Sequence, residues 1–310
     1  MEHSLAMWAG FITAVLVMLA VDLGVFNRKL HAVSFKESLV WSIIWVAVSM
    51  GFAGALYVHE GAKPATEFIT GYLIEKSLSA DNIFVFVMIF SYFSVPPLYQ
   101  HRVLFWGIIG ALVLRGIMIA MGAALLAAFS WVIYLFGGFL ILTGLKMAFA
   151  KTDDVDPAKS PIMRLFRKFM PVTAEFHGTK FFVNIDGKRW ATPLFLVIVT
   201  VGTTDFLFAL DSIPAIFAVT LDPFIVFTAN VFAVLGLRSM YFMLAGVVEK
   251  FHYLKVALSA ILVFVGIKMC LIHTPYKIET SHSLMVVGAT LVLAIIASII
   301  RDKRMTKKEA

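Results

Sequence analysis

Residues 192–219 read TPLFLVIVTVGTTDFLFALDSIPAIFAV, and this stretch decides the fold. It is long enough to cross roughly 30 Å of hydrocarbon at about 1.5 Å per residue. It nevertheless carries two acids, Asp205 and Asp211, inside the apolar run. An acid at the centre of a spanning helix costs roughly 2.5–3.5 kcal/mol on insertion scales. The stretch therefore predicts a membrane helix whose buried charges serve a function.

The rest of the chain has the composition of a membrane protein. Of its 310 residues, 61% are hydrophobic and 15% are charged, and the mean hydropathy is +0.92. Soluble domains carry about 25% charged residues. We expect an all-α polytopic membrane protein with about nine transmembrane helices. The predicted spans lie near 6–26, 38–58, 66–93, 102–128, 130–149, 192–219, 223–248, 254–272 and 283–300.

The lysine and arginine residues indicate the orientation. If the N-terminus lies outside, nineteen of them fall in inner segments, and only Lys63 and Lys277 fall in outer ones. Cytoplasmic loops carry such an excess of basic residues. We therefore place the N-terminus outside and the C-terminus inside, in a multi-pass protein of the inner (plasma) membrane. The net charge of +7 is thus an orientation signal, and we expect no nucleic-acid partner.

The one long polar segment, 150–191, is predicted to be a cytoplasmic loop. Its basic residues Arg164, Arg167 and Lys168 are expected to rest on anionic lipid headgroups. Its end, FFVNIDGKRWATP at 181–193, has turn residues between aromatic and β-branched ones and predicts a short hairpin. We expect the loop to be mainly a connector, with regulation as the alternative.

Two parts of the chain resemble each other in their polar positions. EKSLSADNIFVF at 75–86 is similar to TTDFLFALDSIPAIF at 203–217. The matched positions are Glu75 and Asp205, Asp81 and Asp211, Arg115 and Arg238, and the Gly-X-Lys-Met motifs at 144–147 and 266–269. Because the two units enter the membrane from opposite sides, they predict an inverted repeat of two three-helix units. Inverted repeats are a design of secondary transporters, which bind substrate near the midplane.

This repeat divides the chain into five parts. The expected parts are an N-terminal two-helix segment (1–65), the first three-helix unit (66–149), the cytoplasmic loop (150–191), the second, inverted unit (192–272), and the last helix with its basic tail (273–310).

Four acids are the predicted metal site: Glu75, Asp81, Asp205 and Asp211. Six helical residues advance about 9 Å and leave the two acids of each unit about 120° apart. On ideal helices both could not reach one ion. Either the helix is broken, which Pro214 favours in the second unit, or the acids form two layers of a pathway.

Further residues are expected to support this site. Asn82 and Ser212 each follow an acid and offer neutral oxygen ligands. Arg115 and Arg238 are the expected counter-charges when no cation is bound. The alternative is that Lys76, Arg115 and Arg238 neutralise the acids in a purely structural network. Asp22, near the inner end of the first span, is a candidate for the pathway, with a side chain that reaches the interface as the alternative.

Oxygen ligands select hard divalent ions such as Mn²⁺, Mg²⁺ and Ca²⁺. Because neighbouring carboxylates raise each other's pKa, they also share protons readily. Competition between cation and proton is a simple basis for antiport, so we expect protons as the coupling ion. We expect no permanently bound cofactor and no enzyme activity, because no nucleophile–base pair, phosphate loop or HExxH motif is present.

Two long motifs carry a resemblance to a known family. GYLIEKSLSADNIFVFVMIFSYFSVP at 71–96 and DFLFALDSIPAIFAVTLDPFIVFTANVFAVLGLRSMYFMLAG at 205–246 resemble the TerC family of integral membrane proteins, most closely its Alx-like branch. The likeness runs from the first span to the end of the eighth. It implies manganese(II) export with induction at alkaline pH. Carried over by motif, Glu75, Asp81, Asp205 and Asp211 look like the family's intramembrane acids.

Two other functions compete with efflux of Mn²⁺. One is a membrane-biogenesis or metal-delivery partner of secreted proteins, which the long cytoplasmic loop would serve. The other is tellurite resistance, after which the family is named. Acid-lined spans repel an oxyanion, so we expect any tellurite effect to be indirect.

Overall fold

The computed structural model describes residues 4–26, 34–149, 171–185, 187–245 and 253–309, without the side chains of 22–26, 80–81, 84 and 302–309. The helices are α1 (Leu5–Phe26), α2 (Phe35–Glu60), α3 (Ala62–Tyr92), α4 (Pro97–Ala128), α5 (Val132–Phe149), α7 (Pro193–Phe217), α8 (Pro223–Leu235), α9 (Leu237–Leu244), α10 (Leu254–Cys270) and α11 (Thr280–Glu309). The strands are β1 (Phe182–Ile185) and β2 (Lys188–Ala191).

Local signals explain where several helices begin. Ser34 precedes α2, and its side chain accepts a hydrogen bond from the backbone N–H of Glu37 at 3.2 Å. Asp222 does the same for the N–H of Phe224 at the start of α8, at 2.9 Å. Such side chains satisfy backbone donors that the first helical turn leaves without partners. Helices α4, α7 and α8 each begin at a proline, whose missing N–H costs nothing there.

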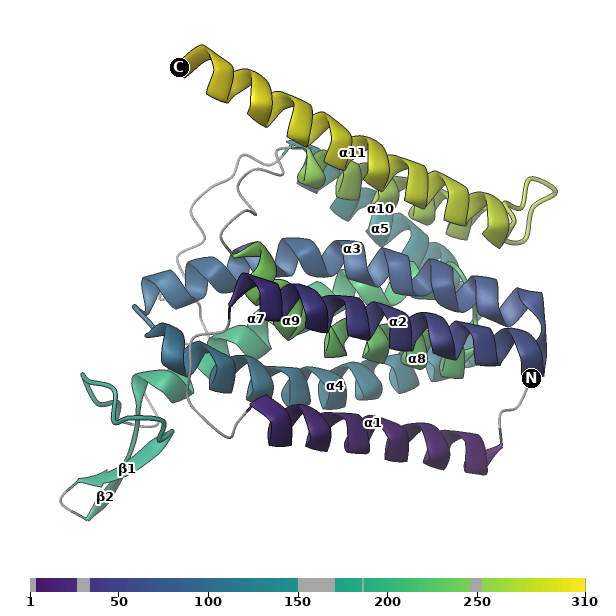
Figure 1. Cartoon of the computed structure of the whole chain (residues 1–310). Helices are drawn as coiled ribbons and strands as arrows, with labels where there is room; N and C mark the ends of the chain where they lie inside the picture. Colours follow the sequence, from purple (N-terminus) through teal and green to yellow (C-terminus); the bar gives the residue numbers. More distant parts are fainter. Residues whose placement is uncertain (1–3, 27–33, 150–170, 186, 246–252, 310) are drawn as a thin grey trace.

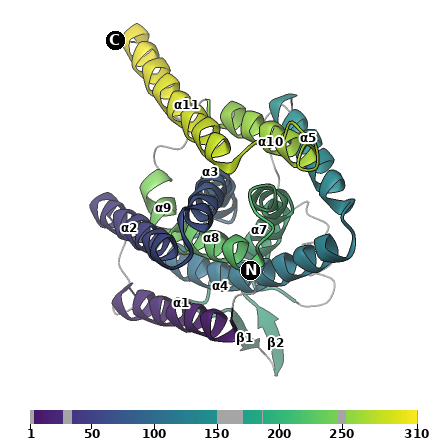
Figure 2. The same ribbon diagram turned by 90° about the vertical axis from the view of Figure 1, so that its right-hand side faces the viewer.

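The long helices lie side by side in a bundle around α3 (Figure 1). Seen along their axes in Figure 2, α3, α7 and α8 occupy the middle, and α1, α2 and α4 cover one side of them. Helices α5, α10 and α11 form a second group on the other side. The α3 and α7 helices, which carry the predicted acids, contact each other in the centre of this bundle.

Six helices in the described part are long and apolar enough to cross a membrane. They are Phe35–Glu60, Pro97–Ala128, Val132–Phe149, Pro193–Phe217, Pro223–Leu244 (α8 with α9) and Thr280–Arg301. The other three predicted spans coincide with α1, α3 and α10, which are helical but are not among the six. The chain is therefore an all-α polytopic membrane protein.

The predicted hairpin is confirmed. Strands β1 and β2 pair antiparallel, with Phe182 opposite Ala191 and Ile185 opposite Lys188. Gly187 in the turn has a φ of 76°, a conformation that glycine adopts without strain. The hairpin projects from one end of the bundle, beside the start of α7 (Figure 1). The predicted headgroup contacts of Arg164, Arg167 and Lys168 fall outside the described residues.

The helix break expected at Pro214 is wrong. Helix α7 continues through Pro214 and ends at Phe217. The proline lies in the last turn, where its missing N–H deprives only the Leu210 carbonyl of a helical partner, and the helix continues to its end three residues later. A discontinuity does occur in the next span, where α8 ends at Leu235 and α9 begins at Leu237. Gly236 joins the two segments with φ −80° and ψ −1°.

Helices α5 and α10 approach each other closely through glycine. A Cβ atom on Gly144 would lie 2.9 Å from the carbonyl oxygen of Ser259, and one on Gly266 would lie 2.7 Å from that of Gly137. Ser259 also donates a hydrogen bond to the Gly144 carbonyl at 2.7 Å. The order of these contacts makes the two helices antiparallel. Gly144 and Gly266 are the matched glycines of the two Gly-X-Lys-Met motifs, so each motif contacts the other helix in the same way.

Candidate intramembrane carboxylate site

Arg115 joins two of the predicted acids in the centre of the bundle. From α4, its Nε and Nη2 donate to the two carboxylate oxygens of Asp205 on α7, at 3.0 and 2.9 Å. Its Nη1 forms an ion pair with Glu75 on α3. Exposed fractions are 1% for Arg115, 0% for Glu75 and 3% for Asp205. The matched acids of the two units therefore meet on one guanidinium that is shielded from the surroundings.

This arrangement is electrostatically demanding. Two carboxylates and one guanidinium leave a formal charge of −1 in a setting where each charge loses its hydration. Only one Glu75 oxygen is used, and the other, Oε2, has no hydrogen-bond partner among the described residues. The site thus holds an excess of acceptor oxygens, which a further cation would satisfy.

Lys76 supplies a second positive charge beside Glu75. Its ammonium donates to the carbonyl oxygen of Ala233, near the end of α8, at 3.3 Å. A Cβ atom on Gly236 would lie 2.6 Å from this ammonium and 3.3 Å from Cβ of Trp45. The discontinuity between α8 and α9 therefore leaves room for a lysine at the carbonyl end of α8, where the helix dipole favours a cation.

Asp211 occupies a separate position on α7. Its Oδ1 accepts a hydrogen bond from the Thr143 hydroxyl of α5 at 3.2 Å, and the side chain is partly buried. Because α7 is unbroken, Asp205 and Asp211 are about 9 Å apart along its axis. The two acids of the second unit thus lie at two levels, the second of the arrangements that the spacing allows.

The other predicted site residues have different surroundings. Asn82 and Ser212 are buried, and the Ser212 hydroxyl has no hydrogen-bond partner in the described part of the chain. Arg238 on α9 is buried and lines a small cavity with Trp45 and His101. Asp22 and Asp81 lie in α1 and α3, but their side chains are outside the described residues.

No ready-made metal centre exists among the described residues. They contain no group of three or more His, Cys, Asp or Glu side chains arranged to hold an ion. Of the four predicted acids, the structure brings Glu75 and Asp205 together and keeps Asp211 apart. The reason is geometric, since continuous helices separate acids that are six residues apart.

Sequence reasoning missed Asn230 on α8. It is 1% exposed, and neither its carboxamide oxygen nor its nitrogen has a hydrogen-bond partner among the residues described. Helix α8 packs against α3 and α4, which carry Glu75 and Arg115. An unpaired buried amide costs about 1–3 kcal/mol, so its retention calls for an explanation. The sequence could have indicated it, because Asn230 is the only side-chain amide in the predicted span 223–248.

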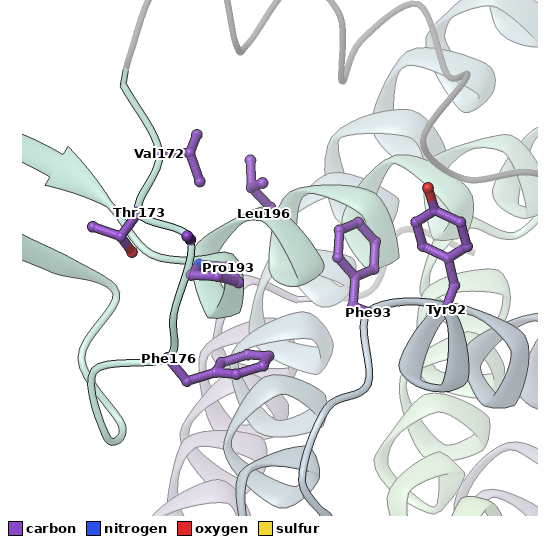
Figure 3. Close-up of a pocket in the computed structure, with 8 residues that line it drawn as sticks. Tyr92, Phe93, Val172, Thr173, Phe176, Pro193 and Leu196 are labelled. Atoms are coloured by element: carbon purple, nitrogen blue, oxygen red, sulfur yellow. The ribbon is translucent and has the colours of Figure 1, made fainter.

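Two cavities lie along α3 and α7. The larger, of about 570 Å³, is at the end of the bundle that carries the hairpin, and Figure 3 shows its lining. The smaller one touches Asp205 itself, together with Val201 and Phe86. On α7, the Thr203 and Thr204 hydroxyls donate to the carbonyls of Val199 and Thr200, each four residues earlier.

Comparisons with known proteins agree with these features. A family described as "Integral membrane protein TerC family" matches residues 60–307. The chain is 56% identical over 304 residues to "Uncharacterized membrane protein STKORF319" of Myxococcus xanthus, covering 98% of this chain and 95% of the relative.

It is 49% identical over 299 residues to "Putative membrane-bound redox modulator Alx" of Escherichia coli (strain K12), covering 94% of this chain and 93% of that protein. The protein of the same name from Salmonella typhi is 47% identical over 311 residues, with 96% and 97% covered. No solved structure matches the chain significantly. Since the family match spans most of the chain and includes the buried acids on α3 and α7, the protein belongs to the TerC family of integral membrane proteins.

Proposed function

We propose that this protein is a divalent-cation transporter of the inner membrane, and that it exports manganese(II) in exchange for protons. One observation carries the proposal. Glu75 and Asp205, on helices from two different parts of the chain, converge on Arg115 in the buried centre of a membrane bundle. Intramembrane acids are costly and mark ion or proton pathways.

Arg115 has the properties of a substitute cation. A guanidinium cannot be deprotonated, so Arg115, together with the neighbouring Lys76 ammonium, balances the two carboxylates when no metal is present. A divalent cation brings twice its charge and needs the same oxygens. We infer that the incoming ion takes Glu75 and Asp205 from Arg115, while Asp211, on another level of α7, receives or releases the ion.

Neutral oxygen groups on α7 and α8 are candidate ligands along the pathway, with Ser212 at the level of Asp211. The carboxamide of Asn230 and the hydroxyl of Ser212 are buried without hydrogen-bond partners among the described residues. A hard cation accepts such oxygens as ligands alongside carboxylates. The transported ion would supply a partner for these two oxygen atoms, while the carboxamide nitrogen of Asn230, a donor, would still need an acceptor.

An inverted repeat forms part of the proposal, together with nine spans, an outer N-terminus and an inner C-terminus. Besides the matched glycine contacts of α5 and α10, α3 packs on α8 just as α7 packs on α4. A Cβ atom on Gly71 of α3 would lie 3.3 Å from Ala229 Cβ on α8. A Cβ atom on Gly107 of α4 would lie 3.2 Å from Val201 Cγ1 on α7. These paired contacts support two units related by a pseudo-two-fold axis.

The choice of manganese rests on the family resemblance, while the acids themselves support any hard divalent ion. The Escherichia coli and Salmonella typhi relatives carry the name "Putative membrane-bound redox modulator Alx". This chain has a single cysteine, Cys270, so a disulfide within one chain is not available to it. Metal transport requires no such chemistry.

The decisive experiment measures total cell manganese by elemental analysis after a manganese challenge. It compares cells that make the wild-type chain, Asp211→Asn, Thr143→Val or no protein, at equal membrane expression. We expect the wild type and Thr143→Val to lower cell manganese and Asp211→Asn to leave it high. Equal manganese with wild type and Asp211→Asn, or with wild type and no protein, would contradict the proposal.

Proton coupling has its own test. In inside-out vesicles, an imposed pH gradient that is acidic inside should accelerate uptake of Mn²⁺ by the wild type. Uptake that is indifferent to the gradient would remove antiport from the proposal and leave uncoupled transport.

A further inference from the structure

The larger cavity lies where the two acid-bearing helices meet the polar loop segment. It is lined by Tyr92 and Phe93 at the end of α3, by Pro193 and Leu196 at the start of α7, and by residues 172–174 and 176. Figure 3 shows Phe93, Phe176 and Leu196 around one space. In the proposed orientation this end of the bundle faces the cytoplasm.

The smaller cavity lies deeper in the bundle, where α4 supplies four lining residues and α3 and α7 also contribute. On α7, Leu196 lines the outer cavity and Val201 the deeper one, five residues or about 7.5 Å further along. On α3, Phe93 lines the outer cavity and Phe86 the deeper one, about 10 Å apart along the helix axis. Since Asp205 lines the deeper cavity, the seam between α3 and α7 leads from the polar end of the bundle to the carboxylate site.

An apolar layer separates the two cavities. It consists of Ile89 and Phe90 on α3 and Val197 on α7, which belong to one buried cluster and are at most 2% exposed. A hydrated divalent ion does not cross such a layer, because it would lose its water without gaining a ligand. Hydrophobic constrictions of this kind act as gates in channels.

Beside this layer, α7 carries a row of hydroxyl groups. Thr200 donates to the carbonyl of Leu196 at 2.9 Å, and Thr204 donates to that of Thr200 at 2.8 Å. Each hydroxyl oxygen keeps acceptor capacity after donating its proton. The row begins at the floor of the larger cavity and ends next to Asp205, so it offers oxygen atoms at each turn between them.

We propose that the larger cavity is the cytoplasmic vestibule for a hydrated hard divalent cation, and that Ile89, Phe90 and Val197 form the gate between it and Asp205. The inference rests on the proposed transport function and adds an entry site and a closing layer. In the structure described, the gate is shut and Arg115 holds the acids. When α3 and α7 separate at the layer, Thr200 and Thr204 accompany the ion to Asp205.

Because Cys270 is the single cysteine of the chain, one substitution gives a cysteine-free background for the test. In a Cys270→Ser background, one cysteine is introduced at Ala174, which lines the vestibule, or at Ser91, an exposed neighbour that does not. Inside-out vesicles are treated with a charged, membrane-impermeant thiol reagent, and Mn²⁺ flux is measured. We expect both sites to react and the flux to fall at least tenfold with Ala174→Cys alone.

A third cysteine, Val201→Cys, reports on the gate. It should react at least tenfold more slowly than Ala174→Cys while the layer is intact. Phe90→Ala, or the milder Val197→Ala should the first fail to fold, should raise its reaction rate at least tenfold. Excess Mn²⁺ should slow that reaction, and Asp205→Asn should remove the protection.

Several results would overturn the inference. Flux that survives modification of Ala174→Cys contradicts the vestibule alone, since transport itself persists. Reaction of Val201→Cys as fast as Ala174→Cys with the layer intact contradicts the gate. Absence of Mn²⁺ flux in the cysteine-free protein, when the wild type is also inactive, contradicts the proposed function and the vestibule with it.

Discussion

Arg115 on α4 holds the carboxylate of Asp205, 90 residues further along the chain, through two hydrogen bonds of 3.0 and 2.9 Å. Bidentate pairs of this type are stronger and more directional than pairs with a single contact. The third link, to Glu75, makes the same guanidinium common to α3, α4 and α7. One side chain thus joins three helices at deeply buried polar positions.

Removal of Arg115 should destabilise the protein strongly. Arg115→Gln leaves two buried carboxylates without a cation, and breaking a buried pair costs about 3–5 kcal/mol. We expect a large fall in the thermal midpoint in detergent. Arg115→Lys should be intermediate, because a lysine ammonium is compact and cannot make the bidentate contact.

A neutral triad is the matched control for this prediction. Combining Arg115→Gln with Glu75→Gln and Asp205→Asn removes all three charges, so no carboxylate is left uncompensated. The triple variant should regain much of the lost thermal midpoint and carry no Mn²⁺. A triple variant as unstable as Arg115→Gln would mean that the charges do not account for the loss.

Asp211 should separate transport from stability. Asp211 accepts a hydrogen bond from the neutral Thr143 hydroxyl, and the side-chain oxygen of an asparagine at this position can accept the same bond. We expect Asp211→Asn to retain the thermal midpoint and to lose at least tenfold in vesicle Mn²⁺ flux. Thr143→Val removes the bond at a cost of about 1 kcal/mol and should retain the flux. The reverse pattern would make Asp211 a structural residue.

Substitution of Asn230 should stabilise the protein, whereas most substitutions of buried residues destabilise it. Asn230→Leu replaces an unpaired buried amide with an apolar group of similar size and removes a desolvation cost of about 1–3 kcal/mol. We expect the thermal midpoint to rise and the Mn²⁺ flux to fall. Thr228→Val on the same helix is the control, since the Thr228 hydroxyl already donates to the Ile225 carbonyl at 3.2 Å. Normal flux with Asn230→Leu would exclude its amide from the site.

The contact between α5 and α10 should tolerate no side chain at Gly266. A Cβ atom there would lie 2.7 Å from the Gly137 carbonyl and 2.8 Å from Ile141 Cγ1, so Gly266→Ala must push the helices apart. Overpacking typically costs about 1–3 kcal/mol. Gly138→Ala meets nothing within 4 Å and should leave the thermal midpoint equal or slightly higher. Equal behaviour of the two variants would refute the close approach.

Much of the fold was predictable because long apolar runs leave few alternatives. Every predicted span overlaps helical residues, although the span at 223–248 is divided into α8 and α9 and six helices are long and apolar enough to cross a membrane. The hairpin at 182–191 follows from its turn residues. Pro214 misled because a local rule was applied without knowing where the helix would end. The discontinuity at Gly236 has no such local signal: the ammonium that lies against it belongs to Lys76, from a helix about 160 residues earlier in the chain.

The candidate site was predictable only in part. Internal similarity identified the acids, since matched polar positions are rare between apolar helices. It could not predict that Arg115 would bind Glu75 and Asp205 together, because Arg238 matches Arg115 equally well. Outside the site, the burial of Lys268 was likewise not predictable from the sequence. Its place near a helix end indicates a side chain that reaches the interface, yet tertiary packing leaves it only 7% exposed.

The triad also imposes an order on biosynthesis. Glu75 on α3 and Arg115 on α4 lie on consecutive helices of the chain, so both charges enter the bilayer before Asp205 is made. Asp205 is synthesised later, and it can pair only if the Nε and Nη2 atoms of Arg115 are still accessible. In the nascent first unit, no other helix may therefore cover these two nitrogen atoms until α7 leaves the translocon. A chain that ends after α5 would present a half-satisfied guanidinium to lipid, and pulse-chase labelling should show it degraded faster than the full-length protein.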